Sequence, residues 1–336
     1  MSLTTVTGGG AFTRQNITDI NANFQRLADS LSGTVGNVIY CWPASGYLGP
    51  QDGSIDKPYS DIVTAYGKGR NGMNDVIVLV GNGAASGSAR ISANLAWAKD
   101  ALHLVGVDSG VNISNRARIA PTSGATAFAN FFTLSGNGCL IQDIQFFHGF
   151  GTGTTAQICV TVTGSRNKFV NCHIAGMGDA ASAQDAGSRS LKIGSSGSGE
   201  NMFVNCTIGI DTVTRTQANA SVEFAGATPR NQFINCLFPF QTSAAGVLGI
   251  LATGNGSMDR FQYFDRCMFI NNIKSTSTTM TVLASCTTAS PGGLLLHNRS
   301  VLVGIGEYGD TNGLANSYVD GLTGAAATSG IAVNPS

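Results

Sequence analysis

The apolar and polar positions of this sequence repeat one short pattern, N-x-F-x-N-C-x-I. It occurs as NKFVNCHI from residue 167, as NMFVNCTI from residue 201 and as NQFINCLF from residue 231. RFQYFDRCMF (260–269) is a degraded fourth copy, and CLIQDIQF (139–146) fits the same frame upstream. The cysteines of the four later copies, Cys172, Cys206, Cys236 and Cys267, follow one another at steps of 34, 30 and 31 residues. Periods of this length are typical of stacked repeats.

Within each copy, the alternation of apolar and polar residues changes phase at an asparagine. Side chains of a straight strand alternate between its two faces, so Phe169 and Cys172, three residues apart, cannot both face the interior of one strand. A residue in the left-handed conformation between them removes this conflict, and Asn and Gly adopt positive φ most readily. Asn171 is therefore predicted to turn a corner between two short strands.

Equivalent corner positions can be assigned along the chain. The apolar strands 76–81 and 102–107 end in glycines that fit the same position. The predicted corner series is Gly81, Gly106, Asp143, Asn171, Asn205, Asn235 and Arg266. Stacked coils place equivalent residues about 4.8 Å apart, so the asparagines are expected to form a hydrogen-bonded ladder.

The repeated cysteines are predicted to face inward. Cys172, Cys206, Cys236 and Cys267 would form a column of sulfur atoms that fills apolar space. We expect free thiols, because parallel Cβ vectors in register suit a disulfide poorly.

The chain resembles the right-handed parallel β-helices of the pectate-lyase-like class, as found in bacteriophage tailspikes, fibres and other virion proteins. The resemblance covers roughly residues 50–303 and includes the lead-in GSIDKPYSDIVTAYGKGRNGMNDVIVLVGNG (53–83), where a turn and a short capping helix precede the first strand. It implies an all-β solenoid. The calcium-binding acids and the basic residue that pectate lyases use cannot be placed in this sequence, so no catalytic, cofactor-binding or metal-binding residue is carried over.

Four segments are predicted. Residues 1–36 form an N-terminal helical oligomerisation or docking segment, 37–75 a lead-in with a capping helix, 76–303 a β-helix of about eight coils, and 304–336 an irregular Gly- and Ala-rich tail. In the first segment a heptad pattern of apolar residues, typical of an amphipathic helix, is formed by Ile17, Ile20, Phe24, Leu27 and Leu31. Such a helix could join copies of the chain, or it could instead cap the first coil.

Composition narrows the possible partners. Only 11% of the residues are charged and the formal net charge is zero, so no basic excess is present to hold a polyphosphate, and nucleic acid is not expected as a partner. The sequence MSLTTVTGGG at the start lacks the features of a signal peptide, and no apolar run is long enough to span a membrane. We therefore expect neither signal-driven secretion nor membrane insertion.

Candidate catalytic residues are few. Arg166, Glu200 and Arg230 stand six residues before three of the repeat cysteines and are predicted to form an exposed ion ladder. Glycan hydrolysis commonly needs two carboxylates, and the acids to consider are Glu200, Asp211, Glu223, Asp259 and Asp265, most of them at unmatched positions. The histidines His103, His148, His173 and His297 share no metal-ligand spacing, and His173 is expected at the surface.

The outward positions of the repeat suggest contact with another surface. Val170, Val204 and Ile234 form an apolar stripe where polar residues are usual. Such a stripe needs cover, from loops of the same chain or from another copy, and we favour a homotrimer.

The expected function is a structural one in a bacteriophage virion. The chain would be made in the host cytoplasm and serve, without a cofactor, as a trimeric head decoration, head fibre or collar component in contact with the major capsid protein or other virion proteins. The alternative is a tailspike or tail fibre that binds a host surface glycan, with or without cleaving it. Few paired acids and only two tryptophans, Trp42 and Trp97, favour the first function.

Overall fold

The computed structural model describes residues 36–108, 110–123, 129–149, 156–194, 197–272, 278–287, 292–309 and 317–319. The predicted assembly helix with Ile17, Ile20, Phe24, Leu27 and Leu31 lies outside these residues, as does most of 304–336.

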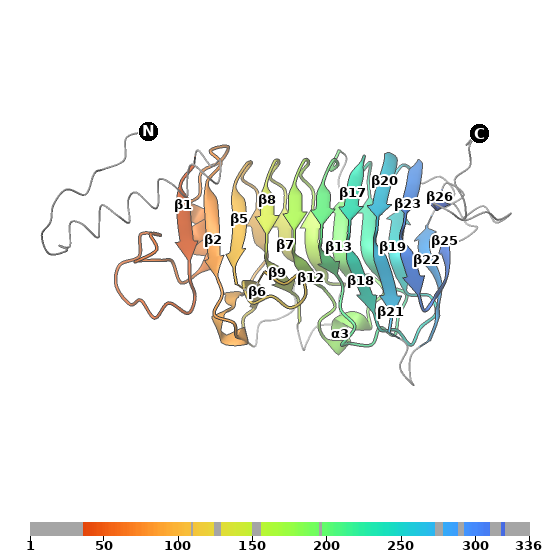
Figure 1. The fold of residues 1–336 in the computed structure, drawn as a ribbon, viewed down its shortest axis with the longest axis horizontal. Helices are drawn as coiled ribbons and strands as arrows, with labels where there is room; N and C mark the ends of the chain where they lie inside the picture. The colour runs from red at the N-terminus through yellow and green to blue at the C-terminus, as the bar shows by residue number, and fades with distance from the viewer. Residues whose placement is uncertain are drawn as a thin grey trace, which may run out of the picture.

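The chain winds into a solenoid whose strands lie side by side along one axis (Figure 1). Among the described residues, three sheets of ten, eight and eight strands run along it, and neighbouring strands pair in parallel. Each repeat coil passes from sheet 1 through a tight corner to sheet 2, then through a loop to sheet 3 and through a turn back to sheet 1. The prediction of an all-β, right-handed parallel β-helix is confirmed.

Sheet 1 consists of β1 (Val38–Cys41), β2 (Val76–Val80), β5 (His103–Val107), β8 (Leu140–Gln142), β11 (Lys168–Val170), β14 (Met202–Val204), β17 (Asn231–Ile234), β20 (Arg260–Asp265), β23 (Gly293–Asn298) and β26 (Ser317–Val319). Sheet 2 consists of β3 (Ala89–Ile91), β6 (Arg118–Pro121), β9 (Gln145–Phe147), β12 (His173–Ala175), β15 (Thr207–Ile208), β18 (Leu237–Phe240), β21 (Met268–Asn271) and β24 (Val301–Val303). Sheet 3 consists of β4 (Leu95–Trp97), β7 (Asn130–Leu134), β10 (Ile158–Val162), β13 (Arg189–Gly194), β16 (Ala220–Ala225), β19 (Leu248–Thr253), β22 (Met280–Cys286) and β25 (Ile305–Gly309).

The parallel pairing extends beyond the predicted solenoid of residues 76–303 at both ends. β1 pairs with β2 near the N-terminal end, while β25 and β26 continue sheets 3 and 1 at the other. Within the lead-in, helix α2 (Ile62–Lys68) begins at Asp61, whose carboxylate accepts hydrogen bonds from two backbone N–H groups of the first turn. The ammonium group of Lys99 binds carbonyls at the other end of α2, so the helix is fixed at both ends.

Positive φ angles mark the corner between sheets 1 and 2. They are 55° at Asp143, 52° at Asn171, 54° at Asn205, 54° at Asn235 and 51° at Arg266. The side-chain ladder is made of pairs: Asn171 donates to Asp143 over 3.2 Å, and Asn235 donates to Asn205 over 2.8 Å. The corner backbone is hydrogen-bonded to the next coil as well, for example from Asn205 N to Ile234 O. Register at the corner is therefore held by backbone and side chains together.

The two glycines of the predicted corner series do not behave as corners. Gly106 is in register with Asp143, but neither it nor Gly81 has a positive φ, and Gly81 lies two residues beyond the position that pairs with Gly106. The first two coils pass to sheet 2 through longer loops, so no tight corner is needed there. Gly106 is needed for another reason, because a Cβ atom would lie 2.1 Å from the carbonyl oxygen of Asp143.

The core is built from columns of like residues. The phenyl rings of Phe169, Phe203, Phe233 and Phe264 stack with centroids 4.5–4.8 Å apart. The imidazole of His297 continues the stack, 5.2 Å from Phe264. Beside the rings run the four repeat cysteines, all buried and all free thiols.

Replacing a corner asparagine should destabilise the solenoid. Asn205→Val is expected to lower the free energy of unfolding by about 1–3 kcal/mol, because a β-branched residue is strained at positive φ and the hydrogen bond with Asn235 is lost. Asn205→Gly removes the same hydrogen bond without the strain and should cost less. Urea unfolding of both variants measures the difference, and equal losses would refute the role of the backbone conformation.

His297 is expected to weaken the core in acid. Burial lowers the pKa of His297 from 6.5 to about 3, and neither ring nitrogen has a hydrogen-bond partner within the described part of the chain. Below pH 6.5 the unfolded chain binds a proton that the folded chain does not, so stability falls by about 1.4 kcal/mol per pH unit as the pH drops towards 3. His297→Phe should remove this contribution and raise stability at neutral pH. A stability difference between variant and parent that stays constant from pH 7 to pH 4.5 would contradict the assignment.

Candidate functional site

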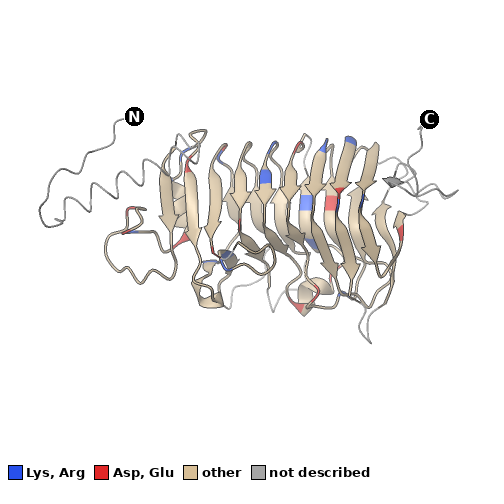
Figure 2. Ribbon diagram, viewed as in Figure 1, with Lys and Arg blue, Asp and Glu red and all other residues tan. Residues whose placement is uncertain are grey.

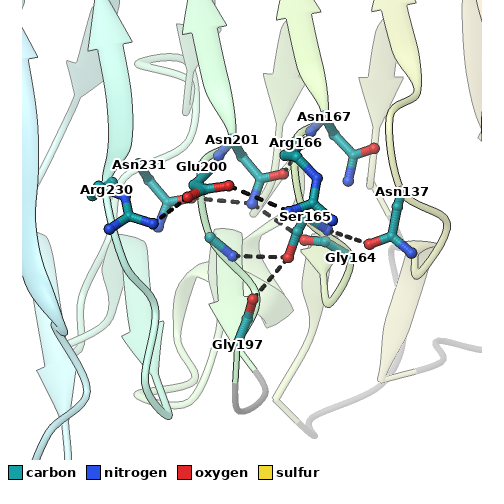
Figure 3. Close-up of polar contacts among 11 residues, drawn as sticks. Asn137, Gly164, Ser165, Arg166, Asn167, Gly197, Glu200, Asn201, Arg230 and Asn231 are labelled. Atoms are coloured by element: carbon teal, nitrogen blue, oxygen red, sulfur yellow. Dashed lines mark hydrogen bonds and ion pairs between the residues drawn. The ribbon is translucent and has the colours of Figure 1, made fainter.

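The turns between sheet 3 and sheet 1 carry the predicted ion ladder (Figure 3). Glu200 accepts from Arg166 over 3.4 Å on one side and pairs with Arg230 on the other. All three residues have positive φ, so they are the residues that turn the chain here. The hydrogen bond and charge of Arg230 hold the pKa of Glu200 below its ordinary value. Glu200 is therefore ionised at neutral pH.

A second asparagine ladder lies directly behind these charges, and the sequence analysis missed it. Asn167, Asn201 and Asn231 are the first asparagines of the three repeat copies, and all are buried. The backbone N–H of Asn167 donates to the side-chain oxygen of Asn201 over 3.0 Å, and that of Asn201 donates to Asn231 over 3.1 Å. The sequence does contain a signal for this ladder, because the asparagine at the first position of the repeat pattern recurs as strictly as the corner asparagine.

Three of the other four candidate acids are each paired with cations of their own. Glu223 on β16 accepts from Arg189 over 2.6 Å and from Lys192 over 2.9 Å, and its side chain is only 8% exposed. Asp265 at the end of β20 contacts Arg266 and Arg299. Asp259 pairs with the neighbouring residue Arg260. Asp211 has no ion-pair partner among the described residues.

The pKa values of two of these acids oppose a role as proton donor. Burial pushes the pKa of Glu223 up, but the charges of Arg189 and Lys192 outweigh burial, so the pKa lies below its ordinary value. Glu200 is shifted in the same direction. A general acid that works near neutral pH needs a raised pKa, so neither side chain is suited to protonate a leaving group.

His173 does not lie at the surface, and that expectation is wrong. The residue is 3% exposed, because the loop segment of residues 110–117 folds over sheet 2. Its Nδ1 accepts from the backbone N–H of Ser114 over 3.0 Å and lies 3.1 Å from Nε2 of Gln145, while its Nε2 donates to the carbonyl of Gly209 over 3.0 Å. Burial lowers the pKa of His173 to about 4, so the imidazole is neutral at physiological pH.

A hollow of about 260 Å³ opens on the outer face of sheet 2, beside His173. Its floor is formed by β9, β12, β15 and β18, and the loops around residues 113 and 210 form its sides. The lining includes Gln145, Phe147, Thr207, Ile210, Asp211 and Leu237. Repeat periodicity could not reveal this hollow, because the loops that enclose it follow no repeat.

The outer face of sheet 1 presents an apolar stripe along one register column. Its partly exposed members, interrupted only by Gln142, are Tyr40, Val78, Val105, Val170, Val204 and Ile234. Charged residues are sparse along the strands and gather mainly in turns and loops (Figure 2). The stripe is therefore a surface suited to contact with another apolar surface.

Within the described ranges, no group of three or more His, Cys, Asp or Glu side chains could hold a metal ion. In the same part of the chain, no helix has the length and apolar character needed to cross a membrane.

Comparison with known proteins identifies the fold. No protein-family model matches the chain, and no curated protein matches its sequence. A pectin methylesterase in complex with a hexasaccharide aligns with a TM-score of 0.52 at 16% identity, covering 86% of this chain and 94% of that one. A pectin methylesterase from Erwinia chrysanthemi gives 0.47 at 14% identity (89% and 93% covered), and an Acinetobacter phage tailspike protein gives 0.37 at 13% identity (79% and 54% covered). The first of these likenesses shows the parallel β-helix fold and nothing about activity.

Glu223 is expected to be a structural acid. Glu223→Gln should lower the free energy of unfolding by about 3 kcal/mol, because two cations lose the negative charge that compensates their burial. Glu200→Gln is the matched control: it removes an acid with two arginine partners from an exposed ladder and should have little effect. Chemical denaturation of the two variants makes the comparison. An equal loss in both would contradict the assigned difference in burial.

Proposed function

We propose that the chain is a structural protein of a bacteriophage virion, in which three copies of the solenoid pack along their sheet 1 faces. The observation that supports this proposal is the apolar stripe of sheet 1 with Val170, Val204 and Ile234 at its centre. Large apolar patches on isolated proteins usually mark contact surfaces. The assignment to a bacteriophage virion is based on the sequence resemblance to phage β-helix proteins.

The geometry of the stripe suits a second copy of the same chain. Its residues lie in one column with one residue per coil, so they form a straight line at the coil spacing of about 4.8 Å. The column is interrupted by Gln142 and continues past Ile234 through Asp265 and Asn298, so the apolar contact between two identical rods would extend from Tyr40 to Ile234. The low charge of the strands means that little desolvation opposes the contact.

Within the virion, we assign the trimer to the head surface, as a decoration, a fibre or a collar component that contacts the major capsid protein or other virion proteins. The N-terminal segment 1–36, with its heptad of apolar residues, would join the copies or attach them to the particle. The alternative function is a tailspike that binds a host glycan, with or without cleaving it, and cleavage by hydrolysis would need a proton-donating carboxyl group. Glu200 and Glu223 do not supply one, because their pKa values are lowered.

Trimer formation can be tested by introducing a charged residue into the apolar stripe of sheet 1. Val204→Lys is expected to convert a trimer to monomers in analytical ultracentrifugation, because three ammonium groups would be buried near one another. Val303→Lys is the control, since Val303 is an exposed valine of sheet 2 that lies off the stripe.

Deletion of residues 1–36 should also abolish the trimer or its incorporation into particles, while circular dichroism stays β-rich. A wild-type monomer, or variants that all remain trimeric, would contradict the proposal.

The location is tested on particles. Immunogold electron microscopy of the phage that encodes the chain should label the head, and purified protein incubated with host capsule or lipopolysaccharide should release no oligosaccharide. Label at the tail tip together with released oligosaccharide would establish the tailspike function instead.

A further inference from the structure

The hollow on sheet 2 contains buried acceptor atoms without partners. Within the described residues, the side-chain oxygen of Gln145 and the hydroxyl oxygen of Thr207 have no hydrogen-bond partner. Both residues line the hollow and are almost fully buried, at 3% and 1% exposed. A buried acceptor left unpaired costs roughly 1–3 kcal/mol, so an occupant that donates hydrogen bonds would recover this energy.

The amide donor of Gln145 and the imidazole donor of His173 are already used. Because Nδ1 of His173 accepts from Ser114 N, the imidazole proton must lie on Nε2, which donates to Gly209 O. The same Nδ1 faces Nε2 of Gln145, which fixes the amide with its nitrogen on the histidine and leaves its oxygen unpaired. The hollow therefore offers acceptors, and its amide and imidazole nitrogens are not free to bind an anion.

A carboxylate lies on the same lining. Of the five acids that the sequence singled out, Glu200, Glu223, Asp259 and Asp265 are ion-paired, whereas Asp211 has no cation partner in the described part of the chain. Asp211 is partly exposed, so it is accessible to a cation from solution. It adds a negative charge beside the two unpaired acceptors.

Two arginines lie near the hollow but do not line it. Arg215 is held behind Gly209, where its Nη2 donates to Ser221 over 3.0 Å. Arg118 lies over the ring of Phe147 and donates to Ser88 over 2.7 Å. Nε and Nη1 of Arg215 have no hydrogen-bond partner among the described residues, but neither guanidinium belongs to the lining of the hollow. The positive charges of both arginines would lower the affinity for a cation bound there.

We propose that this hollow binds a primary ammonium group on an aliphatic stem. The ammonium would donate its three hydrogens to Gln145, Thr207 and Asp211, the unpaired acceptors of the lining. The stem would pack against the apolar wall formed by Phe147, Ile210 and Leu237. The chemistry is shared by a lysine side chain of a partner polypeptide and by a free polyamine, and it is independent of the virion assignment.

The proposal is tested with n-butylammonium as the probe and n-butanol as its neutral counterpart. Ligand-observed NMR titration of the full chain at constant ionic strength should show saturable binding of n-butylammonium and much weaker binding of n-butanol. Asp211→Asn should weaken n-butylammonium binding by about tenfold or more, the loss expected for a charge-assisted hydrogen bond. Asp259→Asn is the matched control, because Asp259 is an acid outside the lining, and it should leave binding unchanged.

A second variant separates binding from folding. Thr207→Val keeps the shape of the side chain and removes the unpaired hydroxyl, so it should weaken the binding of n-butylammonium while the thermal melt is retained. Titration with Nα-acetyl-lysine N-methylamide and with spermidine then distinguishes the two sources of the ammonium group, and tighter binding of either supports the proposal. No saturable binding, equal affinity for n-butanol, or binding unchanged in Asp211→Asn would overturn it.

Discussion

The structure depends on one constraint: each coil must stay in register with the coils on either side. Each parallel strand is hydrogen-bonded to the equivalent strands of the neighbouring coils. If one strand slipped by one residue, all of its inward side chains would face outward. Residues with positive φ enforce the register, because they change the facing of the chain at the same point of successive coils. Asn171, Asn205 and Asn235 do so between sheets 1 and 2, and Arg166, Glu200 and Arg230 do so between sheets 3 and 1.

Because the coils are in register, equivalent residues contact each other in successive coils, and their interactions add up along each column. Phenylalanine stacks on phenylalanine and cysteine follows cysteine, so an apolar column gains from each added coil. A column of like charges would instead repel itself, and the turn ladder avoids this by placing Glu200 between two arginines. Asparagine suits a column of its own kind because its amide both donates and accepts, as the buried Asn201 shows. The low charge of the chain is thus a consequence of stacking.

The parts of the structure that repeat could be predicted from the sequence, and the parts that do not repeat could not. Phe169 and Cys172 reveal the corner because their spacing conflicts with a straight strand. The first two coils lack such a spacing, so Gly81 was placed out of register. His173 was expected at the surface because nothing in its own coil indicates that Ser114, 59 residues earlier in the chain, covers it. Long-range cover by a loop leaves no periodic signal.

The difference between repeating strands and non-repeating loops also determines where the protein can recognise one particular ligand. A column offers the same groups at every coil, so a regular face can guide contact with another regular surface but cannot single out one small ligand. Selectivity needs groups that occur once, and loops supply them. At the hollow, Asp211 and the loop segment that carries Ser114 add to sheet 2 a carboxylate and a side wall that lie outside the repeat pattern. In this molecule the repeats provide length and stiffness, and the irregular loops provide the places where a single chemical group can be recognised.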